Sequence, residues 1–182
     1  MAGRGLSSGP EDKERFEAYE FFAQQYQEYL PRVLNYVRLR VGEEALAQDL
    51  TALAFERALA RLHTLREEKA FGGWLFTIAR RVVAGHYRER RPSLSLQDIE
   101  NSPIPGPSPE GRVEQSEELE VLGKALASLS EREQEIIRLR FIASLANRDI
   151  ARALGLREGN VAVILYRALR KVRCTLKVED ER

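Results

Sequence analysis

The chain has 182 residues, a net charge of +1 and 43% hydrophobic residues, which places it among globular proteins long enough for one large or two small domains. No apolar run approaches the roughly 20 residues of a membrane-spanning helix, and Met1 to Pro10 lacks the apolar core of a signal peptide. Cys174 is the only cysteine, and His63 and His86 are the only histidines, which excludes an internal disulfide and a Cys/His metal cluster. We therefore expect a cytoplasmic protein with no metal and no other cofactor.

The N-terminal half shows helical periodicity and no β alternation. Apolar residues recur at steps of three and four from Phe16 to Leu30, in residues 46–58 and in residues 71–83. Pro31 is expected to start or kink the next helical turn. Aromatic and leucine residues at this spacing usually form a core, so we predict a small helical bundle.

The third predicted helix combines apolar packing residues with a dense arginine cluster. Between residues 78 and 91, five arginines face the single acidic Glu89: Arg80, Arg81, Arg88, Arg90 and Arg91. Guanidinium groups carry a fixed charge and planar donors that suit phosphates, so this helix is a candidate nucleic-acid contact. The alternative is a basic helix end without a ligand, which the helix dipole favours.

The charge reverses after this helix. Residues 92–120 hold seven acidic residues against Arg112 alone, and the same stretch contains five prolines. Repeated prolines break helices and strand ladders, and the few apolar residues cannot offset the entropy of ordering the chain. We interpret residues 92–113 as a linker that is extended or disordered until something binds it.

The C-terminal part begins with a helix-start signal. Ser130 and Glu133 form a capping box, in which side chains satisfy the free N–H groups at the start of a helix. The apolar residues that follow predict that this helix continues to Phe141.

Two further helices complete a pattern that is typical of a helix-turn-helix DNA reader. An apolar stripe over residues 145–154 stops at Gly155, whose missing side chain permits the left-handed conformation that ends helices. The last predicted helix carries an apolar stripe over residues 161–176 and basic residues on its other side. A helical hairpin without DNA-binding function has a similar pattern.

These elements predict an all-α fold of two small helical domains joined by a flexible Pro-rich acidic linker. The second domain is expected to be a helix-turn-helix of the winged-helix-like or four-helix type. The predicted boundaries are a disordered tail over 1–14, a first domain over 15–91, the linker over 92–113, a second domain over 114–177 and a tail over 178–182.

The order of the motifs resembles a known family. Tyr29–Val33, Ala47–Leu50, Phe55–Ala58 and Trp74–Arg80 precede the helix-turn-helix in the order found in bacterial sigma factors of the small, two-domain extracytoplasmic-function type. The resemblance covers nearly everything from Phe16 to Leu176. It implies that the first domain, region 2 of the family, binds core RNA polymerase and melts the −10 element, and that the second, region 4, reads the −35 element.

The resemblance also implies site residues and partners. The partners are promoter DNA, the β′ clamp helices and β flap of core polymerase, and an anti-sigma factor. The polymerase-binding residues are Asp49, Leu50, Leu53 and Glu56. The −10 residues are His63, Arg66, Lys69, Trp74, Arg80, Arg81, His86, Arg88, Arg90 and Arg91. The −35 residues are Arg157, Asn160, Val163, Tyr166, Arg167, Arg170 and Lys171.

Several positions depart from the family pattern. Ala52-Leu53 stand where relatives have Gln-Glu, Arg81 replaces an Asn and Gly85 replaces an Asp. In the second domain, Ala146 and Arg157 replace helix-capping serines, and Ala162-Val163-Ile164 replace Lys-Ser-Arg. Phosphate contacts are thereby lost from the first turns of the last helix, and apolar contacts, for example to thymine methyl groups, remain available.

Two other classes stay open at this point. A helix-turn-helix regulator that acts without polymerase accounts for the second domain but leaves the arginine-rich helix and the acidic linker without a role. A divergent sigma-like protein whose second domain binds a protein partner gains support from Val163 and Ile164. We do not expect an enzyme, because the chain shows no nucleophile–base or metal-ligand spacing and no Gly-rich phosphate loop.

Overall fold

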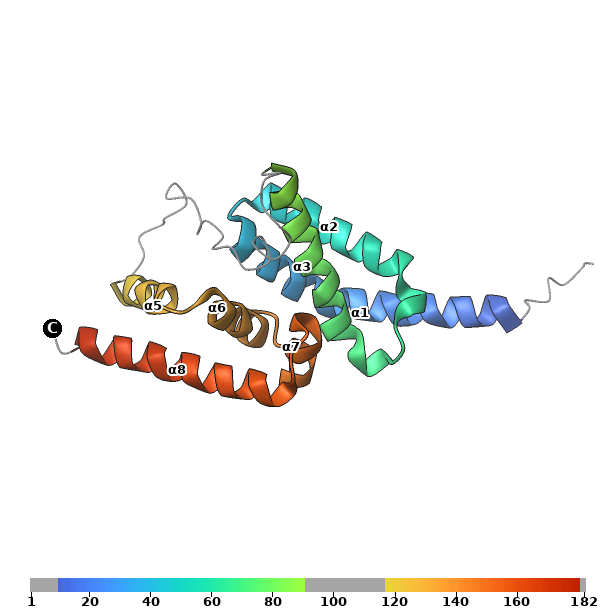
Figure 1. Ribbon diagram of the computed structural model, residues 1–182. Helices are drawn as coiled ribbons and strands as arrows, with labels where there is room; N and C mark the ends of the chain where they lie inside the picture. The colour runs from blue at the N-terminus through green and yellow to red at the C-terminus, as the bar shows by residue number, and fades with distance from the viewer. Residues whose placement is uncertain (1–9, 91–116, 181–182) are drawn as a thin grey trace, which may run out of the picture.

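The computed structural model describes residues 10–90 and 117–180, and within these ranges every regular element is helical. The predicted all-α class is therefore confirmed, and the second domain takes the four-helix form. The linker predicted over 92–113 lies outside the described residues. Figure 1 shows three long N-terminal helices against a stack of four C-terminal ones.

The N-terminal bundle consists of α1 (Pro10–Val41), α2 (Glu44–Ala60) and α3 (Phe71–Arg90). Short 3-10 turns, η1 (Leu62–Thr64) and η2 (Glu68–Ala70), lie in the connection between α2 and α3. Helix α1 runs through Pro31 as one element and begins at Pro10. The predicted tail over 1–14 is therefore wrong for residues 10–14, which carry enough helix-forming residues to extend the first helix.

The C-terminal bundle consists of α5 (Glu117–Ala127), α6 (Glu131–Ile137), α7 (Asn147–Leu154) and α8 (Glu158–Asp180). The predicted capping box is confirmed, because Ser130 accepts from the backbone N–H of Glu133 and the Glu133 carboxylate accepts from that of Ser130. Gly155 ends α7 in the left-handed conformation, with a φ of 64°. Helix α8 continues to Asp180, so the tail predicted over 178–182 is wrong for its first three residues.

The predicted helix from Ser130 to Phe141 changes its geometry partway. After Ile137 the chain forms a π-helical turn, η4 (Arg138–Ile142), and Ser144 then takes a positive φ of 54°. A π turn widens the helix by one residue and rotates the side chains that follow. Leu139 and Leu145 thereby both become buried at the end of α6 that meets the N-terminal bundle.

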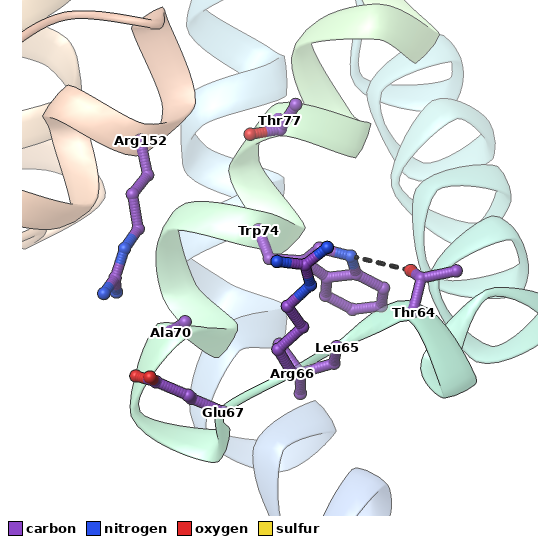
Figure 2. A pocket seen from close by; sticks show the side chains of 8 residues that line it. All are labelled: Thr64, Leu65, Arg66, Glu67, Ala70, Trp74, Thr77 and Arg152. Atoms are coloured by element: carbon purple, nitrogen blue, oxygen red, sulfur yellow. Dashed lines mark hydrogen bonds between the residues drawn. The ribbon is translucent and has the colours of Figure 1, made fainter.

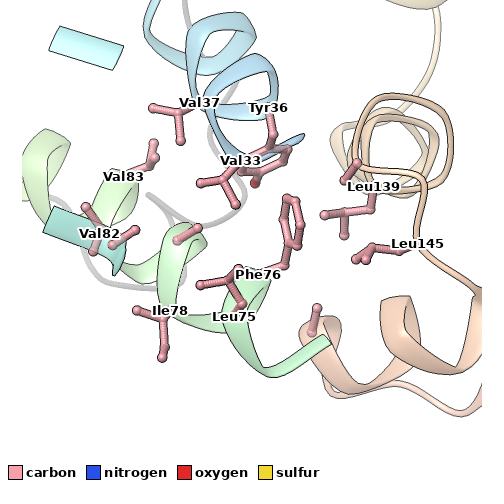
Figure 3. Packing of buried hydrophobic residues seen from close by; sticks show 14 of the residues in the cluster. Val33, Tyr36, Val37, Leu75, Phe76, Ile78, Val82, Val83, Leu139 and Leu145 are labelled. Atoms are coloured by element: carbon pink, nitrogen blue, oxygen red, sulfur yellow. The ribbon is translucent and has the colours of Figure 1, made fainter. Parts of the chain in front are cut away.

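The two bundles share one hydrophobic core. Tyr36 of α1 and Phe76 of α3 are fully buried, and Leu139 and Leu145 face them from the C-terminal bundle (Figure 3). The rings of Tyr36 and Phe76 meet edge to face, with centroids 5.4 Å apart. The core therefore continues from one predicted domain into the other.

Candidate nucleic-acid and polymerase interfaces

The connection from α2 to α3 forms a hollow against the first turns of α3. Its volume is about 360 Å³, and its lining residues are Thr64, Leu65, Arg66, Glu67, Ala70, Trp74, Thr77 and Arg152. The Trp74 indole N–H donates to the Thr64 hydroxyl at 3.3 Å, which fixes one wall (Figure 2). Arg152 comes from α7, so the C-terminal bundle contributes to this hollow. An aromatic face beside guanidinium groups is suited to a stacked, unpaired base.

Most of the residues predicted to contact the −10 element surround this hollow or continue along α3. His63, Arg66, Lys69, Arg81 and Arg88 are exposed, whereas Trp74 and His86 are half-buried. Lys69 forms an ion pair with Glu67 at 3.4 Å. The predictions for Arg90 and Arg91 concern side chains outside the described part of the chain.

Arg80 departs from its prediction as a DNA contact in this structure. Its side chain is 14% exposed and points into the junction between the bundles. Nε donates to the Glu135 carboxylate at 3.0 Å, and Nη1 donates to the Ala153 carbonyl at 2.7 Å. The sequence groups Arg80 with the other arginines of this helix, because it does not show which face of the helix α7 covers.

Glu135 is the centre of a buried charge cluster that joins the two bundles. One carboxylate oxygen accepts from Arg40 at 2.7 Å, and the other accepts from the Tyr36 hydroxyl at 2.7 Å as well as from Arg80. Arg138 adds a longer contact at 3.5 Å. The Arg40 and Glu135 side chains are only 6% and 7% exposed, respectively, so this pair is removed from water.

The electrostatics of the cluster favour its charged form. Burial by itself raises the pKa of Glu135, but the charges of Arg40 and Arg80 and the Tyr36 hydrogen bond outweigh burial and hold that pKa below its ordinary value. Burial, with the Glu135 charge next, raises the pKa of Tyr36, so its hydroxyl remains a donor. Glu135 is therefore an ionised carboxylate held by groups from α1 and α3.

The predicted polymerase-binding residues lie on α2 but do not share one face. Asp49 and Glu56 are exposed and Leu53 is half-buried. Leu50 is only 6% exposed and belongs to the core, so the structure does not place it on an exposed docking face. The apolar stripe of an amphipathic helix packs inward, and Leu50 lies on that stripe with Ala47 and Ala54.

The predicted −35 residues lie from Arg157, just before α8, to Lys171, past the middle of α8, and are exposed. Tyr166 and Val163 are 67% and 48% exposed, respectively. Arg157, Asn160, Arg167 and Arg170 are likewise exposed. Lys171 instead donates to the Glu133 carboxylate at 2.7 Å, so that its charge is partly neutralised. Ala146 begins α7 without a side-chain cap, as the sequence predicts.

Sequence reasoning missed the residues that join the bundles. Glu135, Arg40 and Arg152 look like ordinary solvated charges in the sequence, and no spacing distinguishes them. Gly73 is the one partial signal, since a glycine within a helix often marks a close approach. A Cβ at Gly73 would lie 2.7 Å from the Asp149 carbonyl oxygen and 3.2 Å from the Arg152 Cβ, both on α7.

Across residues 10–90 and 117–180, no group of three His, Cys, Asp or Glu side chains is arranged to hold a metal ion. No helix in the described part of the chain is long and apolar enough to cross a membrane.

Both halves of the chain match known protein families. The model of Sigma-70 region 2 matches residues 25–92, and the model of Sigma-70 region 4 matches residues 119–172. The first match covers the hollow and the arginines of α3, and the second covers the helix-turn-helix. Together they define a protein of the sigma-70 class.

Individual relatives narrow the class. The chain is 37% identical over 158 residues to the ECF RNA polymerase sigma factor BldN of Streptomyces coelicolor, a match that covers 82% of this chain and 58% of BldN. It is 29% identical over 159 residues to the ECF RNA polymerase sigma factor RpoE of Cereibacter sphaeroides, and that match covers 84% of each chain. The chain therefore belongs to the extracytoplasmic-function (ECF) sigma factors of the sigma-70 family.

Solved structures agree with this fold. The sigma factor RpoE of Bartonella quintana, in complex with the anti-sigma factor NepR, matches with a TM-score of 0.63 at 25% identity over 86% of this chain and 97% of that one. CnrH, in complex with the cytosolic domain of CnrY, matches in fold with a TM-score of 0.60 at 21% identity over 90% of this chain and 97% of that one. Sigma factor membership accounts for both bundles, which a polymerase-independent regulator does not.

Proposed function

We propose that this sigma factor divides promoter recognition between its two bundles. The exposed face of α2 around Asp49 and Glu56 docks on the β′ clamp helices of core polymerase. The hollow between Thr64 and Trp74, with α3, binds the −10 element, and α8 reads the −35 element beside the β flap. The observation that carries the proposal is the Trp74 hollow with exposed arginines along the same helix.

The −10 step follows from the chemistry of that hollow. A base that leaves the duplex loses its stacking, and an aromatic wall with polar neighbours replaces part of that loss. Trp74 and Thr64 provide such a wall, and Arg66 lies at its edge. Arg81 and Arg88 extend the positive charge along α3, where phosphates of the same strand would lie. The chain thus stabilises the open strand and supplies no catalytic group, because catalysis belongs to the polymerase.

The −35 step relies on α8. Arg167 and Arg170 supply charge for phosphates, and Val163 and Tyr166 offer apolar contacts to base edges. These contacts are few, so the isolated second domain binds DNA weakly. Tethering to polymerase raises the effective concentration and makes weak contacts sufficient. A second candidate, docking of a protein partner, is favoured by the exposure of Val163 and Tyr166.

The proposed location of the protein in the cell follows from its proposed binding to core polymerase. A factor that assembles with core polymerase works in the cytoplasm, where the chromosome lies. The RpoE chain of Bartonella quintana was solved with an anti-sigma factor, and we propose an anti-sigma factor as a regulator of this chain too.

Run-off transcription with purified core polymerase on fragments of the host chromosome tests the proposal and yields a promoter. On that promoter, we expect Asp49→Arg to lower polymerase retention and transcription at least tenfold, whereas Glu20→Arg, an exposed α1 position, leaves both unchanged. We expect Arg88→Ala to lower permanganate reactivity at −10 and to reduce the salt slope by about 1, since one phosphate contact is lost. Arg38→Ala is the matched control for Arg88→Ala. If Asp49→Arg leaves polymerase retention unchanged and Arg88→Ala leaves permanganate reactivity at −10 unchanged, the roles proposed for α2 and α3 are refuted.

A further inference from the structure

The first turns of α1 extend beyond the rest of the N-terminal bundle and border an apolar groove (Figure 1). Two hollows, of about 320 and 430 Å³, lie between these turns and the end of α2 with its following connection, and they share Ala18 and Leu62 as walls. We call the two hollows together the α1 groove. Tyr19 and Leu59 are 52% and 41% exposed, respectively, so large apolar side chains here face solvent. The large apolar residues that line the groove are Tyr19, Phe21, Leu59, Leu62 and Leu65.

The rim of the α1 groove has an uneven charge. The smaller hollow is bordered by three carboxylates and one guanidinium, from Glu14, Glu17, Glu68 and Arg66. Glu17 also lies 3.8 Å from Lys13, but both side chains are mostly exposed, and such a pair contributes little. The larger hollow has Arg15 and His63 in its wall. The excess of carboxylates at the smaller hollow repels phosphates, so this end of the groove suits a protein surface with apolar and basic side chains.

The same chain carries a surface of this kind on α8. Val163 and Tyr166 are exposed apolar residues, and Arg167 and Arg170 are exposed as well. Steps of three, four and seven residues return to the same side of a helix, so these four side chains share one face of α8. That face combines an aromatic ring with two guanidinium groups, which complements the apolar lining and the carboxylates of the α1 groove.

The two surfaces lie apart within one chain. Figure 1 shows the first turns of α1 at the right of the molecule, whereas α8 runs along the lower side towards the left. Helix α8 packs against α5, α6 and α7 and leaves its outer face free of other described helices. A contact between the α1 groove and α8 therefore joins two copies of the chain.

We propose that the α1 groove binds α8 of a second copy of this chain. Val163 and Tyr166 lie on the apolar lining, and Arg167 and Arg170 lie opposite the carboxylates at the rim. The contact is heterologous, because it joins different surfaces of the two copies, so it either closes into a reciprocal pair or extends to further copies. This self-association does not rest on the roles proposed for α2, α3 and α8 in promoter recognition.

The oligomeric state of the full chain, without DNA or polymerase, tests whether copies associate. We expect sedimentation equilibrium to give a mean mass above that of one chain within a range of about 1 µM to 1 mM, which covers the Kd values of weak contacts. The association should weaken when the salt rises from about 0.1 M to about 1 M, because the Debye length falls from about 10 Å to 3 Å. A mass of one chain over the whole range overturns the proposal, and so does an association that salt leaves unchanged.

Charge reversal locates the contact. Glu17→Arg with Glu68→Arg reverses the rim of the groove, and Arg167→Glu with Arg170→Glu reverses the face of α8. All four positions are exposed, so both double variants should keep their helices, which circular dichroism checks. Each double variant alone brings like charges together and should stay monomeric at concentrations where the parent chain associates.

A mixture of the two double variants provides the decisive measurement. In an equimolar mixture every groove can meet an α8 of opposite charge, so association should return. A general loss of stability cannot produce this recovery. The proposal is overturned if either double variant associates as the parent chain does, or if the mixture remains monomeric.

The apolar part of the contact has its own matched pair of variants. Tyr19 lines the groove, whereas Phe16 is exposed on the same turns of α1 but does not line it. Aromatic anchors contribute most to protein contacts and their neighbours little, so Tyr19→Ala should raise the Kd at least about fivefold and Phe16→Ala less than about twofold. An equal effect of both variants refutes the groove as the binding site.

Discussion

Tyr36 provides a sharp test of the energetics of the junction. Its ring is fully buried against Phe76, and its hydroxyl donates to Glu135 at 2.7 Å. Tyr36→Phe removes this hydrogen bond and keeps the ring in place. A hydrogen bond to a charged group contributes about 1.5 to 3 kcal/mol to stability. We therefore expect the free energy of unfolding of the variant to be lower by this amount.

This loss of stability can be measured as a decrease in Tm. For a chain of this size, 1 kcal/mol corresponds to about 2 to 4 °C, so the expected decrease in Tm is about 3 to 12 °C. Differential scanning calorimetry and urea unfolding give the Tm and the free energy. Tyr26→Phe is the matched control, because Tyr26 is 39% exposed, and we expect it to change Tm by less than 1 °C.

The outcome separates two descriptions of the junction. If Tyr36→Phe melts within 1 °C of Tyr26→Phe, then the Tyr36 hydroxyl contributes nothing that water does not replace. In that case the buried carboxylate of Glu135 is held by the guanidinium groups alone, and our reasoning about this hydrogen bond is wrong.

Two further predictions concern acid and helix capping. The pKa of Glu135 lies below its ordinary value of 4.5, so its stabilising effect is complete above that pH and is lost as the pH falls through the lowered pKa. Melting curves should therefore show no loss from this group at neutral pH and a loss that sets in only below pH 4.5, where protonation frees Arg40, Arg80 and Arg138. Glu135→Gln should show a smaller acid-dependent loss, and an equal loss would contradict the prediction. Ala146→Ser should raise the free energy of unfolding by about 1 kcal/mol, because Ala146 has the extended conformation of an N-cap and no side-chain cap. Urea unfolding measures this gain, and no gain would show that water already satisfies the start of α7.

Much of the local structure could be predicted from the sequence. The capping box at Ser130, the left-handed Gly155 and the apolar stripes of α2 and α3 depend on neighbours within a few residues. Family membership was equally accessible, because it rests on the order of short motifs. One error in local structure, the π turn after Ile137, lies where the helix meets the N-terminal bundle and does not follow helix propensity alone.

The arrangement of the two bundles could not be predicted in this way. The sequence determined that the chain forms helices, which stripes are apolar and that arginines gather on α3. Only the tertiary structure decided that Arg80 turns to Glu135 while Arg81 faces solvent. The reason is physical: a charge on a helix has no preferred partner until another element supplies one. Glu135 and Arg40 are 95 residues apart in the chain, so no local pattern records their contact.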